Sequence, residues 1–183
     1  MKRVFAGYST FDLILIAVLA SLGIATKPVV SSIARIITGP LMIPGGVLAG
    51  GIYMMFLILA AGLTSGKFSA IFAAAVQAIL VIVTGVGSQG VFSLVTYLMP
   101  GLAVDIIMQL FRLGKRQKAG IAACFAACMC ANVTGSFLVS AAIFNIPLIP
   151  LLLSLCVAAL SGGLGGLLAY ALIEKIKGMG IIS

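Results

Sequence analysis

The chain has 183 residues, of which 63% are hydrophobic and 8% are charged, and its mean hydropathy is +1.34. Soluble domains are only about half apolar, so a soluble globular protein is excluded. The formal net charge is +8, but the cations lie in short clusters between apolar stretches. Such clusters are topology signals at a membrane surface, so we expect a protein of the lipid bilayer and no nucleic-acid partner.

Apolar runs separated by turn-forming residues predict a single all-α domain, a polytopic bundle of six transmembrane helices. The predicted spans are residues 12–26, 44–63, 68–85, 91–111, 119–144 and 150–176. Between the first two spans lies PVVSSIARIITGPLMI, which is too polar to cross the bilayer and too apolar to lie free in water. We expect this segment to be a partly helical loop at the membrane surface.

The cations are distributed unevenly between the two sides of the predicted bundle. If the N-terminus is cytoplasmic, nine of the eleven Lys and Arg residues lie on the cytoplasmic side, and only Lys27 and Arg35 lie outside. This positive-inside bias predicts that both termini are cytoplasmic. The two outer cations either reach the lipid headgroups, or one of them meets an anionic or carbonyl-bearing solute at an outer vestibule.

Residues suited to catalysis are scarce. The chain has no His, no Gly-x-Ser-x-Gly motif and no second carboxylate near Asp105 in sequence. The four cysteines all lie in apolar segments without a His or a nearby carboxylate that would complete a metal site. We therefore predict that the protein is not an enzyme and holds no cofactor and no metal.

Polar residues within or beside the spans are the candidates for substrate binding, because burying them in a bilayer is costly and they tend to face a cavity or one another. For Gln77 and Asn132, hydrogen bonding between helices and contact with a solute are equal alternatives. The full set of candidates is Arg35, Tyr53, Gln77, Gln89, Thr96, Tyr97, Asp105, Asn132 and Ser136.

Asp105 is the only acid in the interior of a predicted span. A carboxylate there costs about 2.5–3.5 kcal/mol on insertion scales, so some partner must offset its burial. Asp105 either pairs with a basic residue or hydroxyl near the cytoplasmic end, or it forms the floor of a cavity and receives a donor or cation from a solute.

Small residues recur every four positions on the first predicted helix, at Ala17, Ser21 and Ala25. They form a smooth stripe on one face, and small residues allow another helix to approach closely. Such a stripe serves either packing within the bundle or docking of a partner protein.

An ordered motif pattern covers most of the chain. It comprises Thr38-Gly-Pro40, Pro44-Gly-Gly46, Gly66-Lys67, Gln77-Ala78, Pro100-Gly-Leu-Ala-Val-Asp105, Phe111-Arg112, Lys115-Arg116 and Leu160-Ser-Gly-Gly-Leu164. In this pattern and in its size, the chain resembles the substrate-binding S components of energy-coupling factor (ECF) transporters. The resemblance is closest to the YkoE-like S components, which are assigned to thiamine or its hydroxymethylpyrimidine precursor.

The resemblance implies a membrane subunit of a bacterial vitamin importer of the ABC type. Its partners would be a small vitamin and a coupling module, which consists of a membrane scaffold subunit and two ATPases. The family docks on this module through an Ala-x-x-x-Ala stripe, matched here by Ala17 and Ser21, and binds its solute near the outer face. Asp105 could pair with an aminopyrimidine.

One alternative interpretation is a small channel or secondary carrier that works without other subunits. It would use Asp105 as an ion or proton site and would support flux in the absence of ATP.

Overall fold

The computed structural model describes residues 8–41, 45–85, 90–113, 120–143 and 145–180, and the regular elements among them are all helical. The all-α prediction is therefore confirmed. The elements are α2 (Thr10–Thr38), η1 (Gly39–Leu41), α3 (Gly45–Leu63), α4 (Ser69–Thr84), η2 (Gly90–Phe92), α5 (Ser93–Leu113), α6 (Ile121–Phe137), the π-helical segment η3 (Leu138–Ile143) and α7 (Leu148–Gly178).

Five helices in the described part of the chain are long and apolar enough to cross a membrane: α2, α3, α5 with the preceding η2, α6 with part of η3, and α7. The remaining helix, α4, is apolar but has only 16 residues. At 1.5 Å per residue it is about 24 Å long, which is less than the hydrocarbon thickness of about 30 Å. A multi-pass membrane protein is thus supported, and a sixth crossing by α4 stays a prediction.

The first helix is much longer than expected, because α2 continues through Pro28 to Thr38. The predicted end at residue 26 is therefore wrong. Residues 28–38 of the segment expected as a surface loop belong to the same helix, residues 39–41 form η1, and its last two residues lie outside the described part of the chain. Proline removes one helical donor, but membrane helices tolerate it where nearby side chains bond the backbone. Here Thr26 donates to the carbonyl of Gly23 over 3.1 Å, and Ser32 donates to that of Pro28 over 2.7 Å, so hydroxyl groups bond the helix backbone on both sides of the proline. Neither bond reaches the carbonyl of Ile24, which loses its helical donor to Pro28.

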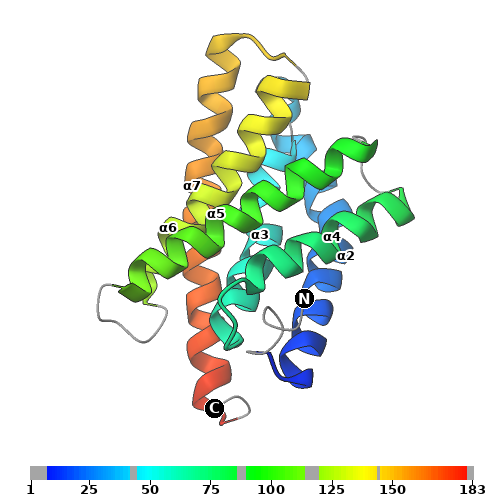
Figure 1. The fold of residues 1–183 in the computed structure, drawn as a ribbon. Coiled ribbons are helices and arrows are strands. Elements are labelled where there is room, and N and C mark those ends of the chain that lie inside the picture. The colour runs from blue at the N-terminus through cyan, green and yellow to red at the C-terminus, as the bar shows by residue number, and fades with distance from the viewer. Residues whose placement is uncertain (1–7, 42–44, 86–89, 114–119, 144, 181–183) are drawn as a thin grey trace.

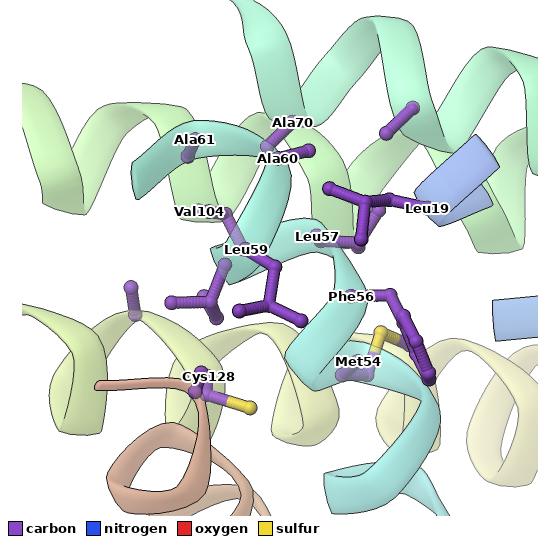
Figure 2. Packing of buried hydrophobic residues seen from close by; sticks show 14 of the residues in the cluster. Leu19, Met54, Phe56, Leu57, Leu59, Ala60, Ala61, Ala70, Val104 and Cys128 are labelled. Atoms are coloured by element: carbon purple, nitrogen blue, oxygen red, sulfur yellow. The ribbon is translucent and has the colours of Figure 1, made fainter. Parts of the chain in front are cut away.

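The most buried helix, α3, lies at the centre of the bundle and contacts α2, α4, α5, α6 and α7. Figure 2 shows its side chains Leu57 and Leu59 within the apolar core, close to Val104 of α5 and Cys128 of α6. The paired helices α4 and α5 run obliquely across the other helices in Figure 1. This packing brings α2, α3, α4 and α5 together around the polar residues described next.

The start of α2 and the end of α7 lie toward the same end of the bundle in Figure 1. The start of α2 is capped locally: the backbone amide of Asp12 donates to the hydroxyl of Ser9 over 3.2 Å, and the amide of Ser9 donates to the carboxylate of Asp12 over 3.1 Å. The carboxylate of Asp12 therefore caps the N-terminus of α2.

Candidate functional site

Lys27 of α2 lies against two tyrosine rings. Its ammonium donates a hydrogen bond to the hydroxyl of Tyr97 on α5, and it lies 4.8 Å from the centroid of the Tyr97 ring. The ring of Tyr53 on α3 has its centroid 5.8 Å from the same ammonium. Both distances fall within the range of cation–π attraction, which strengthens when the cation is removed from water. The rings therefore stabilise a half-buried cation.

Gln77 of α4 lies against α2 at Gly23, one helical turn before Lys27. Its side chain is 2% exposed, and its amide nitrogen Nε2 has no hydrogen-bond acceptor among the described residues. The amide lies against Gly23 of α2, where even a single Cβ atom would collide with it. Gly23 precedes Lys27 by four residues, a rise of about 6 Å along α2.

A small apolar cluster connects these groups. Ile24 of α2, Ala78 and Val81 of α4, and Tyr97 of α5 pack together. Gln77 precedes Ala78 in the chain, so it lies on α4 at the level where α2, α4 and α5 pack together.

Further along α2, Ser31 and Arg35 lie at the start of α3. The hydroxyl of Ser31 is buried, with no hydrogen-bond partner among the described residues. The exposed Arg35 lies with its backbone and side chain close to Gly45. In the same region, the hydroxyl of Tyr53 donates to the carbonyl of Gly46 over 2.8 Å, which fixes the tyrosine ring. We call Gly23, Lys27, Ser31, Tyr53, Gln77 and Tyr97 together the Lys27 cluster.

Asp105 lies away from this cluster, at the N-terminus of α4. Its two carboxylate oxygens accept hydrogen bonds from the backbone amides of Ala70, over 3.2 Å, and Ile71, over 2.8 Å. A helix N-terminus carries partial positive charge and unpaired amides, so a carboxylate is a favourable partner there. On α5, Asp105 follows Tyr97 by eight residues, which is a rise of about 12 Å along the helix axis. This contact accounts for the burial of the acid.

Asn132 connects three helices. Its side-chain nitrogen donates to the carbonyl of Val47 on α3 over 3.1 Å and to that of Ala158 on α7 over 2.8 Å. Of the two alternatives for Asn132, these bonds match hydrogen bonding between helices. Gln77, Asn132 and Asp105 are all buried in the protein, as their cost in lipid predicts.

The other predicted site residues are dispersed. Thr96 donates to the carbonyl of Ser93 within its own helix over 3.3 Å, and Ser136 is buried on α6. Gln89 lies outside the described residues. The structure thus brings Tyr53 and Tyr97 together with Lys27 and places Gln77 against Gly23, one turn before Lys27 on α2. Asp105 and Asn132 lie in contacts of their own.

The small-residue stripe on α2 faces away from the bundle. Ala17, Ser21 and Ala25 are all exposed. The hydroxyl of Ser21 donates to the carbonyl of Ala17 over 2.8 Å, so it is satisfied within the helix and leaves the stripe smooth. Figure 1 shows α2 along one edge of the bundle, where a partner can reach it.

Two residues of the cluster, Gly23 and Ser31, are absent from the candidates that sequence analysis identified, and Lys27 was considered only as an outer cation that meets either the headgroups or a solute. The only sequence signal of Gly23 is its position four residues before Lys27, which places the two on adjacent turns of one helix face. That signal does not reveal which side chain occupies the space beside the glycine.

An all-helical bundle of apolar spans, with polar groups between its helices, is one that membrane transport subunits share with other membrane proteins. Residues 11–134, more than half of the chain, match the family described as "ABC-type cobalt transport system, permease component", and the chain therefore belongs to this family. A transporter permease family is not an enzyme family, which confirms the prediction of a non-enzymatic protein. No curated protein matches the chain.

The fold is also found in a solved structure described as "Crystal structure of an S-component of ECF transporter". That protein superposes with a TM-score of 0.74 and 17% identity, over 95% of this chain and 88% of that chain. The chain thus has the fold of an ECF S component, as the motif pattern implied.

Proposed function

We propose that this protein is the substrate-binding S component of an ECF-type vitamin importer in a bacterial plasma membrane, with both termini cytoplasmic. The Lys27 cluster is its substrate site, and the solute is thiamine, hydroxymethylpyrimidine or a similar small heterocycle. The single observation that carries this proposal is the Lys27 ammonium against the rings of Tyr53 and Tyr97. The unpaired amide of Gln77 lies against Gly23, one turn earlier on the same helix. A planar heterocycle binds by stacking on aromatic rings and by hydrogen bonds to a few correctly oriented polar groups.

The family name refers to cobalt, but the residues of this chain favour an organic solute. Protein sites for divalent transition metals are built from imidazole, thiolate and carboxylate ligands. The chain contains no His, and the described residues contain no group of three or more Cys, Asp or Glu side chains that could hold a metal ion. The proposed site instead offers ammonium, amide and hydroxyl groups.

The proposed site does not include Asp105 or Asn132. Both oxygens of Asp105 accept bonds from α4 amides, and the Asn132 amide is bonded to two helix carbonyls. A channel or carrier that uses Asp105 as its ion site would have to break the contact at the start of α4. We therefore favour the S component over that alternative.

We propose that α2 docks on the coupling module, which consists of a membrane scaffold subunit and two ATPases. Support comes from the exposed stripe of Ala17, Ser21 and Ala25, whose small side chains permit close helix approach. Ser21→Trp is expected to prevent copurification of the module, because the indole holds α2 and the docking helix of the module apart. Leu160→Trp is the matched control, since Leu160 is 72% exposed on α7 and lies outside the stripe.

The substrate proposal is tested by thermal-shift measurements on the purified chain with thiamine, hydroxymethylpyrimidine and Co²⁺. We expect one of the organic solutes, and not Co²⁺, to raise the melting temperature. Lys27→Met is expected to weaken that binding by about tenfold or more, the usual effect of losing a charged hydrogen-bond donor. Lys67→Met, at an exposed lysine in the turn before α4, is expected to leave binding unchanged. Stabilisation by Co²⁺ alone contradicts the proposal.

A further inference from the structure

We infer that Gln77 and Gly23 form the specificity-determining end of the substrate site, and that the part of the solute bound there is a hydrogen-bond acceptor without positive charge. This inference rests on the proposed function and specifies which chemistry the site selects.

The first step is the unused donor of Gln77. A buried amide without an acceptor is costly, and few such groups persist in folded proteins. Gln77 is 2% exposed and its Nε2 has no acceptor among the described residues, in contrast to the doubly bonded amide of Asn132. A structural role does not explain the unpaired nitrogen. A solute atom that accepts its hydrogen bond does.

The second step is the position of that amide against Gly23. A Cβ atom at residue 23 would collide with Nε2 of Gln77 and would lie 3.4 Å from two carbons of Phe56. The glycine thus leaves room for the end of the Gln77 side chain against α2, at a residue one helical turn before Lys27. Because the displaced atom is the end of a flexible side chain, Gly23→Ala moves the amide without disrupting the backbone.

The third step is the charge of the surroundings. Lys27 contributes an ammonium to the cluster, and Arg35 lies further along the same helix. The three acids of the chain lie elsewhere: Asp12 at the start of α2, Asp105 at the start of α4, and Glu174 exposed on α7. A cationic group placed beside Lys27 would meet repulsion with no carboxylate to offset it. An uncharged acceptor meets no such repulsion and would receive the hydrogen bond that Gln77 leaves unused.

The two halves of thiamine test the preference for an uncharged acceptor over a cation. The pyrimidine half carries ring-nitrogen acceptors and no charge, whereas the thiazolium half is a cation. We expect the purified wild-type protein to bind hydroxymethylpyrimidine and not the isolated N-methylated thiazolium. Binding of the thiazolium in preference to the pyrimidine overturns the inference and leaves the proposed function standing.

Gln77→Met tests the role of the amide, because methionine has a similar length and no donor. The melting temperature without solute is expected to stay the same or rise, since the variant removes an amide nitrogen that has no acceptor among the described residues. Affinity for hydroxymethylpyrimidine is expected to fall by about tenfold or more. Gly23→Ala is also expected to weaken binding of hydroxymethylpyrimidine, at little cost in stability. The control is Gly39→Ala, because Gly39 is exposed and has open space around its Cβ position.

Unchanged affinity in Gln77→Met overturns the inference. A large loss of melting temperature with unchanged affinity also overturns it, because the amide would then be a structural group. If the wild type binds neither thiamine half nor thiamine itself, the proposed substrate class fails, and the inference fails with it.

Discussion

Removing the carboxylate of Asp105 is expected to destabilise the bundle strongly. In Asp105→Ala the amides of Ala70 and Ile71 lose their acceptor, and the former bond is fully buried. Leaving one buried donor unpaired costs about 1–3 kcal/mol, and losing a carboxylate at a helix N-terminus costs about 0.3–1 kcal/mol more. The amide of Ile71 is only partly buried, so its loss is counted at the low end of the range. For both amides together we expect the free energy of unfolding to fall by about 3–5 kcal/mol.

The assay is thermal unfolding of the purified protein in detergent. For a chain of this size, 1 kcal/mol corresponds to about 2–4 °C, so Asp105→Ala is expected to melt about 6–20 °C below the wild type. Asp105→Asn keeps one acceptor oxygen and is expected to lie between the two. Glu174→Gln, at an exposed acid, is the control and is expected to change stability by less than about 0.5 kcal/mol.

An Asp105→Ala variant that melts with the wild type would refute this explanation of the buried acid. So would a stable Asp105→Asn variant that abolishes ATP-independent flux through liposomes, because that result identifies an ion or proton site.

Two further predictions concern helix packing and the aromatic pair. Gly51→Ala places a Cβ atom into the backbone carbonyl of Ser161, so we expect a loss of about 3 kcal/mol or more, or failure to fold, whereas Gly39→Ala changes the melting temperature little. Tyr97→Phe keeps the ring and removes the hydroxyl that accepts from Lys27, so solute affinity measured by calorimetry is expected to fall by less than about tenfold. A Gly51→Ala protein as stable as the wild type, or a complete loss of binding in Tyr97→Phe, would contradict these two expectations.

The helices were predictable because hydropathy reports burial in lipid directly. Their ends were less so. Pro28 is a helix-ending signal, but whether a helix continues through proline depends on nearby hydroxyl groups and on packing, and α2 continues to Thr38. The predicted fifth span, residues 119–144, is close in length to α6 with η3, but its last turns are π-helical, which apolar periodicity does not distinguish from α-helix.

The site was predictable only in part. The cost of burying Gln77, Asn132 and Asp105 predicts that they face the protein interior, and they do. Which partners they meet depends on the rotation of each helix about its axis, which composition does not fix. Both oxygens of Asp105 bond backbone amides, and every residue other than proline has such an amide, so side-chain identities do not predict which ones are used. Lys27 was identified as an exception to the charge bias, but its tyrosine neighbours come from two other helices.

Reconstitution into liposomes tests the central claim, that this chain captures a solute for a separate energy-coupling machine. Uptake of radiolabelled hydroxymethylpyrimidine is measured for the chain alone and for the chain with the coupling module, each with and without internal and external ATP. We predict uptake only when module and ATP are both present, and its loss in Ser21→Trp. Uptake by the chain alone, without ATP, would contradict the account.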